Sequence, residues 1–450
     1  MPGEAALDRV GRVVVVGASV GGVRTAQALR SGGFTGELTV IGAEPVEPYD
    51  KPPLSKELLT GERSLAEVSL LRPGDREAFD LRLGAPATGL DTRRREVRVE
   101  GGGRVPYDAL VIATGVRPRT LPGPAAGLVH TVRESSDAET LRRSLATGAP
   151  VVVVGGGFVG AEVAAAAVAA GCPTTLIEAD STPFARVLGS RVGALLTALH
   201  RRGGVRVRAG VPVAGVTGTP GDLVVTLADG ARLAAGTVVV GIGCLPNTEW
   251  LAGSGVPLDD GIVTDEYCAV PGLDGVYAIG DVARWYDGRT ATHRRVEHWT
   301  NAAEQAEAVA RDLLRPQRDA QRAPCRAAPY FWSDQHGVKI QMVGVASGDD
   351  DVEILSCATR TGERRIALYG RGGRFTAAVT FGWPRAAIAC RRAWNQAGTL
   401  AEVREQVARL AVSVTPLAPA APAAPACAPV ERVAARAGVP SRTTPEEGRS

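Results

Sequence analysis

The fold of this chain is decided by the stretch Val151-Val-Val-Val-Gly155-Gly-Gly157-Phe-Val-Gly160-Ala-Glu162, in which four β-branched residues run directly into a cluster of glycines. The pattern predicts a buried strand, a tight turn and a helix. Gly155, Gly157 and Gly160 have the spacing of a dinucleotide-binding fingerprint: the first glycine turns the chain, the second admits the pyrophosphate, and the third lets the helix pack on the strand. We therefore predict that a dinucleotide binds at the amino terminus of this helix.

A second copy of the pattern, Val13-Val-Val-Val-Gly17-Ala-Ser19-Val-Gly21-Gly22, lies near the amino terminus. It departs from the strict fingerprint at Ser19, where a glycine is usual. Serine is small enough to let the pyrophosphate come close, so we interpret Gly17, Ser19 and Gly22 as a variant of the same motif. Two copies predict two bound dinucleotides.

An acidic residue follows each copy, at the end of the next predicted strand. Glu44 comes after the strand 37–41, and Glu178 comes after the strand 174–177. In dinucleotide-binding folds a carboxylate at this place accepts hydrogen bonds from a ribose hydroxyl. Because a carboxylate repels a 2′-phosphate, Glu178 favours NADH over NADPH. For Glu44 an ordinary surface acid is the alternative.

The size and composition of the chain indicate a globular protein, and 450 residues predict two to three domains. A net charge of +3 with 4% aromatic residues does not resemble a nucleic-acid-binding surface. No apolar stretch reaches the roughly 20 residues that span a membrane, and no signal segment precedes the first strand. Seven scattered cysteines without a C-x-x-C pair predict reduced thiols in the cytoplasm, and neither a disulfide framework nor a metal site. They are Cys172, Cys244, Cys268, Cys325, Cys357, Cys390 and Cys427.

We expect an α/β fold with two Rossmann-like dinucleotide-binding domains and a C-terminal α+β domain. The first domain comprises residues 1–120 and 244–322, because the strand that ends at Gly280-Asp281 returns the chain to it, and the second comprises 121–243. Residues 323–410 form the third domain. The Pro- and Ala-rich residues 411–450 form a disordered tail. In the third domain we expect strands at 324–332, 339–343, 354–357, 365–369 and 375–379, and helices at 385–395 and 400–410.

Four further motifs accompany the fingerprints. Consecutive prolines make the segment Pro48-Tyr49-Asp50-Lys51-Pro52-Pro53-Leu54-Ser55-Lys56 rigid, so that Ser55 can cap a short helix and two lysines can face a ligand. The small turn Ala113-Thr114-Gly115 lets the chain pass close to a ligand. Asp281, at an expected helix start, can bond a polyol hydroxyl or simply cap the helix. Glu297-His298-Trp299 opens the predicted helix 300–314.

Taken together, the motifs resemble the flavoproteins of the glutathione reductase fold that bind two dinucleotides. Within that group, the segment 48–56, Glu297-His298-Trp299 and Phe331-Trp332-Ser333-Asp334-Gln335 resemble the NADH-dependent ferredoxin reductases of oxygenase systems, the putidaredoxin reductase type. The likeness covers roughly Arg12 to Leu410. It implies FAD in the first domain and NADH in the second.

The resemblance also implies roles for individual residues. Lys56 would lie beside the reactive edge of the flavin and pair with Glu162, Asp281 would bond the ribityl chain, and Trp299 and Trp332 would wall the site. The residues implied for FAD are Gly17, Ser19, Gly22, Glu44, Lys51, Lys56, Thr114, Gly115, Asp281, Glu297, His298 and Trp299, and those for NAD are Gly155, Gly157, Gly160 and Glu178. An exposed helix acid at Glu162 and core tryptophans are the alternatives.

Two departures from the family pattern stand out. Lys51 stands where the family often has arginine, so a single charge replaces a bidentate fork. His336 stands where tyrosine is frequent, and no role is assigned to it.

The expected reaction follows partly from the position of the cysteines. Disulfide reductases and oxidases of this fold place a redox cysteine in the segment that corresponds to 48–56, whereas no cysteine precedes Cys172 here. Hydride would therefore pass from NADH to the flavin, and single electrons would leave for a small acidic 2Fe–2S ferredoxin that serves a haem-thiolate monooxygenase or a Rieske dioxygenase.

The sequence leaves alternatives for the residues that dock the partner and for the function. Arg294, Arg295, Arg364 and Arg365 are candidate docking charges, or merely solvated arginines. A rubredoxin reductase and an NADH-sensing flavoprotein that resembles apoptosis-inducing factor are the alternative functions.

Overall fold

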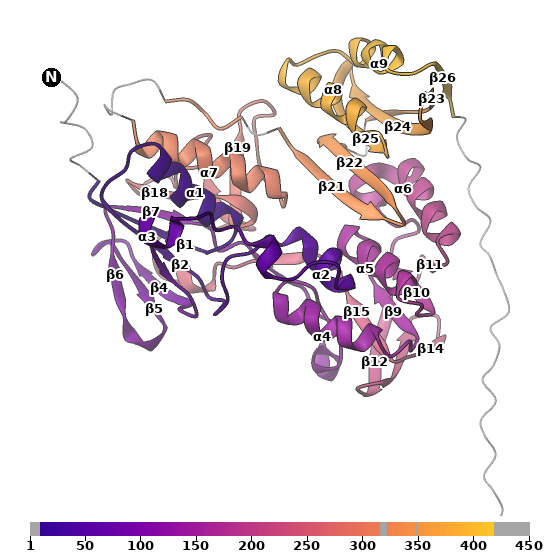
Figure 1. Cartoon of the computed structure of the whole chain (residues 1–450), viewed down its shortest axis with the longest axis horizontal. Helices are drawn as coiled ribbons and strands as arrows, with labels where there is room; N and C mark the ends of the chain where they lie inside the picture. Colours follow the sequence, from indigo (N-terminus) through magenta and orange to yellow (C-terminus); the bar gives the residue numbers. More distant parts are fainter. Residues whose placement is uncertain (1–9, 316–321, 327, 348–349, 418–450) are drawn as a thin grey trace, which may run out of the picture. The chain divides into compact units, whose positions relative to one another are not determined.

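The computed structural model describes residues 10–315, 322–326, 328–347 and 350–417, drawn as ribbon in Figure 1. Its first sheet has five parallel strands in the order β18-β7-β1-β2-β3. Strand β18 follows the second glycine fingerprint in the sequence but pairs with β7, which precedes it. Segments distant in sequence therefore share one sheet. The strands are β1 (Arg12–Val16), β2 (Glu37–Ile41), β3 (Asp80–Arg82), β7 (Ala109–Ile112) and β18 (Val276–Ala278).

Both faces of this sheet are covered, which explains why β1 is a continuous apolar run. Val13 and Val15 pack with helices α1 (Val20–Ser31) and α7 (Trp299–Leu313), and Val14 and Val16 pack on the opposite face. That second face is covered by the antiparallel strands β4 (Ala87–Asp91), β5 (Glu96–Val99) and β6 (Arg104–Pro106).

A four-stranded parallel sheet, β11-β10-β9-β15, forms the second unit. Helices α4 and α5 cover one face of this sheet, and the antiparallel strands β12, β13 and β14 cover the other. Its β-branched strands are therefore buried on both sides. The chain enters and leaves this unit through one antiparallel ribbon, β8 (Val116–Pro118) with β16 (Cys244–Pro246). The unit comprises β9 (Val151–Val154), β10 (Thr174–Glu178), β11 (Arg206–Ala209), β12 (Val213–Thr219), β13 (Asp222–Leu227), β14 (Arg232–Ala235), β15 (Thr237–Val240), α4 (Ser135–Leu145), α5 (Phe158–Ala169) and α6 (Ala185–Arg202).

The C-terminal part is a six-stranded antiparallel sheet in the order β21-β22-β25-β24-β23-β26. One face packs on two helices, α8 and α9, and the other face packs on α6 of the second unit. The first strand begins at Tyr330, so the expected strand 324–332 starts too early and stops too soon. The elements are β21 (Tyr330–Gln335), β22 (Val338–Gly344), β23 (Asp351–Thr359), β24 (Gly362–Arg371), β25 (Arg374–Phe381), β26 (Ser413–Pro416), α8 (Pro384–Asn395) and α9 (Leu400–Arg409).

The prediction that disorder begins at residue 411 is wrong, because residues 413–416 form β26. This strand pairs with β23, and the Val412 amide donates to the Ala358 carbonyl at 2.7 Å. Val414 also packs against the core beneath the sheet. Pairing at the otherwise open edge of β23 outweighs the local Pro- and Ala-rich composition. The rest of the predicted tail, with Cys427, lies outside the described residues.

Shorter elements connect these parts. They are η2 (Pro52–Ser55), α2 (Glu57–Thr60), η3 (Ala66–Val68), α3 (Asp75–Ala78), η4 (Glu100–Gly102), η5 (Gly123–Gly127), η6 (Glu249–Leu251), β17 (Ile262–Thr264), η7 (Gly280–Val282), β19 (Ala283–Asp287) and β20 (Thr292–Arg295). Within the described ranges no helix is long and apolar enough to cross a membrane. Nor do three or more His, Cys, Asp or Glu residues gather in a possible metal site there.

Candidate active site

Both glycine fingerprints form turns that only glycine can make. Gly17 has φ of +118° and Gly155 has φ of +107°, and a Cβ at either would clash with a carbonyl oxygen of the neighbouring strand end. A Cβ at Gly22 or Gly160 would clash with the turn itself, so these glycines let the helix pack on the turn.

The middle position behaves differently. A Cβ at Gly157 would have its nearest neighbour, the Gly241 carbonyl oxygen, at 4.0 Å. Ser19, in the equivalent place, is the N-cap residue of α1 and its side chain makes no cap hydrogen bond. Protein packing therefore does not require a small residue at Gly157, whereas close approach by a pyrophosphate does.

The two predicted ribose acids are held in fixed positions at the ends of β2 and β10. Glu178 accepts hydrogen bonds from the Gly156 amide at 2.7 Å and from the Asp180 amide at 2.9 Å. Glu44 accepts from the Tyr49 hydroxyl at 2.6 Å and pairs with Lys51. Burial lowers the pKa of Lys51. The structure thus brings Glu44 and Lys51, both expected near FAD, into direct contact.

Arg133 joins several predicted FAD residues and was missed in the sequence. Its guanidinium lies 3.8 Å from the Asp281 carboxylate, and its carbonyl accepts from Lys51 at 3.3 Å. A Cβ at Gly115 would lie 2.8 Å from its Nη2 atom. Thr114 instead donates its hydroxyl to the Asn247 carbonyl at 2.9 Å. Nothing in the local sequence around Arg133 signals these contacts, which all come from distant segments.

Asp281 does not start a long helix, contrary to expectation. It lies in the single 3₁₀ turn η7, which runs directly into β19. Burial raises the pKa of its carboxyl group. Among the described residues no hydrogen-bond donor reaches this carboxylate, and Arg133 is its one ion-pair partner. The side chain is therefore available to bond a hydroxyl group.

The central feature is a buried ion pair between Lys56 and Glu162, at 2.8 Å. The Glu162 side chain is 5% exposed and that of Lys56 is 11% exposed. Glu162 also accepts from the Ser55 hydroxyl at 2.5 Å and from the Ser333 hydroxyl at 2.6 Å. The Glu162 carboxylate is thus held by Ser55 and Lys56, from the segment 48–56, and by Ser333 of β21. Ser55, expected to cap a helix, instead ends η2 and bonds Glu162.

Aromatic side chains gather on the segments that carry these motifs. The rings of Trp299 and Trp332 pack edge to face at 6.3 Å, and the Trp299 indole donates to Asp50. Phe331 lies 4.9 Å from His298 and 4.4 Å from Phe158, the residue that follows the second glycine turn. Burial lowers the pKa of His298 to about 4, so its imidazole is neutral at neutral pH.

These residues fit a bound flavin dinucleotide. The buried Nδ1 of His298 has no hydrogen-bond partner within the part of the chain that the structure describes. Buried polar groups are nearly always satisfied, so this unpaired nitrogen indicates a missing polar partner. The free space at Gly157 adds room for a pyrophosphate at the second glycine turn. Glu297, in contrast, pairs with Arg295 and is half-exposed.

Two of the proposed docking arginines are not available on the surface. Arg294 pairs with Asp287 at 3.2 Å and its side chain is 17% exposed. Arg295 pairs with Glu297 and Asp260 and its side chain is 12% exposed. The structure therefore does not support the hypothesis that these residues dock an acidic partner, because nearby carboxylates already pair with both of them. The other pair, at residues 364 and 365, lies on the more exposed β23–β24 hairpin.

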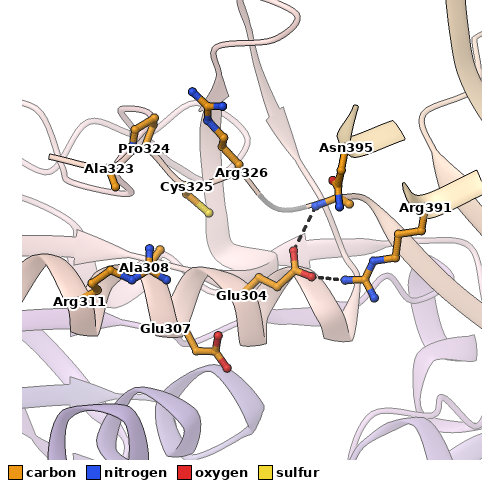
Figure 2. A pocket seen from close by; sticks show the side chains of 11 residues that line it. Glu304, Glu307, Ala308, Arg311, Ala323, Pro324, Cys325, Arg326, Arg391 and Asn395 are labelled. Carbon is orange, nitrogen blue, oxygen red and sulfur yellow. Dashed lines mark hydrogen bonds and ion pairs between the residues drawn. The ribbon is translucent and has the colours of Figure 1, made fainter. Parts of the chain in front are cut away.

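A separate cavity of about 500 Å³ lies between α7 and α8 (Figure 2). Glu304 on its floor pairs with Arg391 and accepts from the Ala328 amide at 3.1 Å. The Arg391 guanidinium lies over the Tyr330 ring at 5.3 Å, and that ring lies 6.2 Å from Trp332. The cavity is thus connected to the tryptophan pair by a short series of ring contacts.

Two exposed arginines at this cavity, Arg311 and Arg326, have no ion-pair partner among the described residues. They differ in this respect from Arg294 and Arg295.

The fold and its two glycine turns define an oxidoreductase that binds two dinucleotides. Residues 11–306 match the pyridine nucleotide-disulphide oxidoreductase family and residues 330–416 match the reductase C-terminal family. The chain belongs to the pyridine nucleotide-disulphide oxidoreductases and, within them, to the NADH-dependent ferredoxin reductases.

Individual relatives support the finer assignment. Rhodocoxin reductase of Rhodococcus erythropolis is 38% identical over 344 residues, 75% of this chain and 79% of the relative. The ferredoxin–NAD(+) reductase component of the p-cumate 2,3-dioxygenase system of Pseudomonas putida is 36% identical over 387 residues, 81% and 93% of the two chains.

A solved structure agrees. The reductase in the covalent putidaredoxin reductase–putidaredoxin complex is 32% identical, with a TM-score of 0.79 over 89% of this chain and 99% of that one. The family expected from the motifs is confirmed, and with it the fold class and the cofactors FAD and NADH.

Proposed function

We propose that this chain takes hydride from NADH and delivers single electrons to a small acidic 2Fe–2S ferredoxin that serves a monooxygenase or dioxygenase. The observation that carries the proposal is the buried Lys56–Glu162 pair together with the lack of cysteine in the segment 48–56, since no cysteine precedes Cys172. Relatives named as reductase components of oxygenase systems support the same acceptor class. We place the reaction in the cytoplasm, where thiols stay reduced.

In this proposal FAD, when bound, accepts hydride and gives up electrons one at a time. Glu44, Lys51, Arg133 and Asp281 would hold it through its ribose, phosphate and polyol groups. Lys56 places a positive charge at the reacting edge, and Glu162 keeps that charge compensated and oriented. Trp299 and Trp332 keep water out.

Anaerobic stopped-flow reduction of the purified holoenzyme tests this function. We expect fast bleaching by NADH, slow bleaching by NADPH, and cytochrome c reduction that depends on added ferredoxin. Slow bleaching with ferredoxin-independent turnover would contradict the proposal and favour an NADH-sensing flavoprotein. If the enzyme reduced rubredoxin in preference to ferredoxin, the acceptor that we propose would be wrong and the chain would be a rubredoxin reductase.

The charge of Glu178 is expected to set the nucleotide preference. In the Glu178→Gln variant, one oxygen still accepts a backbone hydrogen bond, but the repulsion of a 2′-phosphate is lost. The ratio of kcat/KM for NADH to that for NADPH should fall about tenfold, the equivalent of about 1.4 kcal/mol. Steady-state kinetics with both nucleotides measures it. An unchanged ratio would show that specificity lies elsewhere.

Arg311 and Arg326 are the surface charges that we propose for ferredoxin docking. They are exposed and unpaired among the described residues, and Arg391 of the cavity that they flank lies over Tyr330, whose ring is 6.2 Å from that of Trp332. The double variant Arg311→Glu/Arg326→Glu should raise the KM for ferredoxin about tenfold at low salt, with a smaller effect at high salt. Reduction of ferricyanide should not change.

A matched control separates docking from net charge. Arg93 and Arg94 are exposed on the β4–β5 turn, and their double change to Glu alters the total charge by the same amount. If that variant weakens ferredoxin reduction equally, the effect is not local to the cavity.

A further inference from the structure

A chain of buried hydrogen bonds leads away from Glu162 and is not used by the proposed reaction. Beyond Ser333, the Gln335 amide nitrogen lies 2.9 Å from the Ser333 hydroxyl, and the Gln335 oxygen lies 2.9 Å from His200 Nε2. His200 Nδ1 then lies 3.0 Å from His336 Nε2. Ser333, Gln335 and His200 are fully buried. His336, to which the sequence assigned no role, is the outer end of this chain.

The direction of every bond follows from the carboxylate at the inner end. An ionised carboxylate only accepts, so Ser333 donates its hydroxyl proton to Glu162 and its oxygen accepts from the Gln335 amide. The Gln335 oxygen must then accept from Nε2–H of His200. Burial lowers the pKa of His200 to about 4, so the ring is neutral and its Nδ1 accepts from His336. All the donors therefore point towards Glu162.

The outer end of the chain is held in place by backbone geometry. His336 occupies a two-residue turn between β21 and β22 with φ of +50°, a conformation that non-glycine residues seldom adopt. Its ring lies against Gly203 at the end of α6, where a Cβ would clash with the imidazole. His200 is in the last turn of the same helix. The turn and the helix end thus fix both rings.

We propose that Gln335, His200 and His336 are positioning residues for the Lys56–Glu162 pair. They orient the Ser333 hydroxyl towards the carboxylate, and the carboxylate in turn orients the Lys56 ammonium. Without the Gln335 amide, Ser333 is free to rotate and Glu162 loses a fixed donor. This inference rests on the proposed function in so far as Lys56 acts beside the flavin.

The hydrogen-bond directions can be measured without any assay of activity. In side-chain ¹⁵N NMR spectra of the holoenzyme at neutral pH, His200 is expected as the Nε2–H tautomer, with Nδ1 unprotonated. His200→Gln and His336→Gln variants assign the signals among the five histidines. A His200 ring protonated at Nδ1 would reverse the chain and overturn the proposal, whether or not ferredoxin is reduced.

The effect on the site is tested with Gln335→Met, which keeps the length of the side chain and removes both hydrogen bonds. We expect the flavin midpoint potential to become more negative and reduction by NADH to slow about fivefold, the ratio that one net hydrogen bond supports. An unchanged potential and rate in the folded variant would overturn the proposal.

A second pair of variants covers the case in which Gln335→Met does not fold. His336→Gln retains a donor near the position of Nε2, whereas His336→Met has similar length and none. Both place an unfavoured residue at the same φ, so backbone strain cancels in the comparison. The potential should shift in His336→Met and not in His336→Gln. Equal potentials in the two would count against positioning through His200.

Discussion

Replacing Lys56 with methionine is expected to slow the reduction of bound FAD by NADH about 100-fold and to destabilise the protein by about 3 kcal/mol. The Glu162 carboxylate is 5% exposed and would keep only its two serine donors. A buried charge without a counter-ion is costly, and the positive charge at the reacting edge would be lost. Stopped-flow absorbance and chemical unfolding of the same samples measure the two effects.

The double variant Lys56→Met/Glu162→Gln separates these effects. A neutral amide removes the uncompensated charge, so most of the stability should return while the rate stays low. If stability does not return, the loss in Lys56→Met comes from packing and not from charge. A normal rate in either variant would remove Lys56 from the reaction.

Replacing Gly157 with alanine is expected to raise the KM for NADH at least tenfold without lowering the melting temperature. The structure has room for a Cβ there, with 4.0 Å to the nearest protein atom, so the protein itself is not strained. The added methyl group would occupy the space through which the pyrophosphate approaches the backbone. Initial rates at varied NADH and thermal unfolding without nucleotide provide the two readouts.

Gly155→Ala is the matched comparison. At φ of +107° the new Cβ would clash with the Gly241 carbonyl oxygen, so this variant should lose about 2–3 kcal/mol of stability. If Gly157→Ala lowers the melting temperature and Gly155→Ala does not, Gly157 is the glycine that the turn requires and our assignment of the two roles is wrong.

The sequence predicted what depends on local geometry. The glycine turns, the first strands of both units and the acids Glu44 and Glu178 follow from spacing alone, because a turn of this kind constrains its own residues. The fingerprint residues therefore lie at the strand-to-helix turns as expected.

The contacts that complete the site are long-range, and the sequence did not predict them. Arg133 reaches Asp281, and Ser333 reaches Glu162, across separations that no spacing rule covers. Arg295 was expected to be a docking charge or a solvated arginine, but it pairs with Glu297 and with Asp260, which comes from another segment. For the same reason β26 was missed: its stability comes from pairing with β23 and not from its composition.

The β8–β16 ribbon has an implication for the history of the chain. Val116 pairs with Pro246, so the whole NADH-side unit begins and ends at one point on the surrounding structure. A segment whose two ends meet can be gained, lost or exchanged without cutting the parent sheet. Strand β7, which precedes the ribbon, and β18, which follows it after β17, pair directly with each other. Nucleotide preference could therefore be altered by transplanting one continuous piece of gene, provided that the piece keeps Arg133 and Glu162, which contact Asp281 and Lys56 of the flavin site.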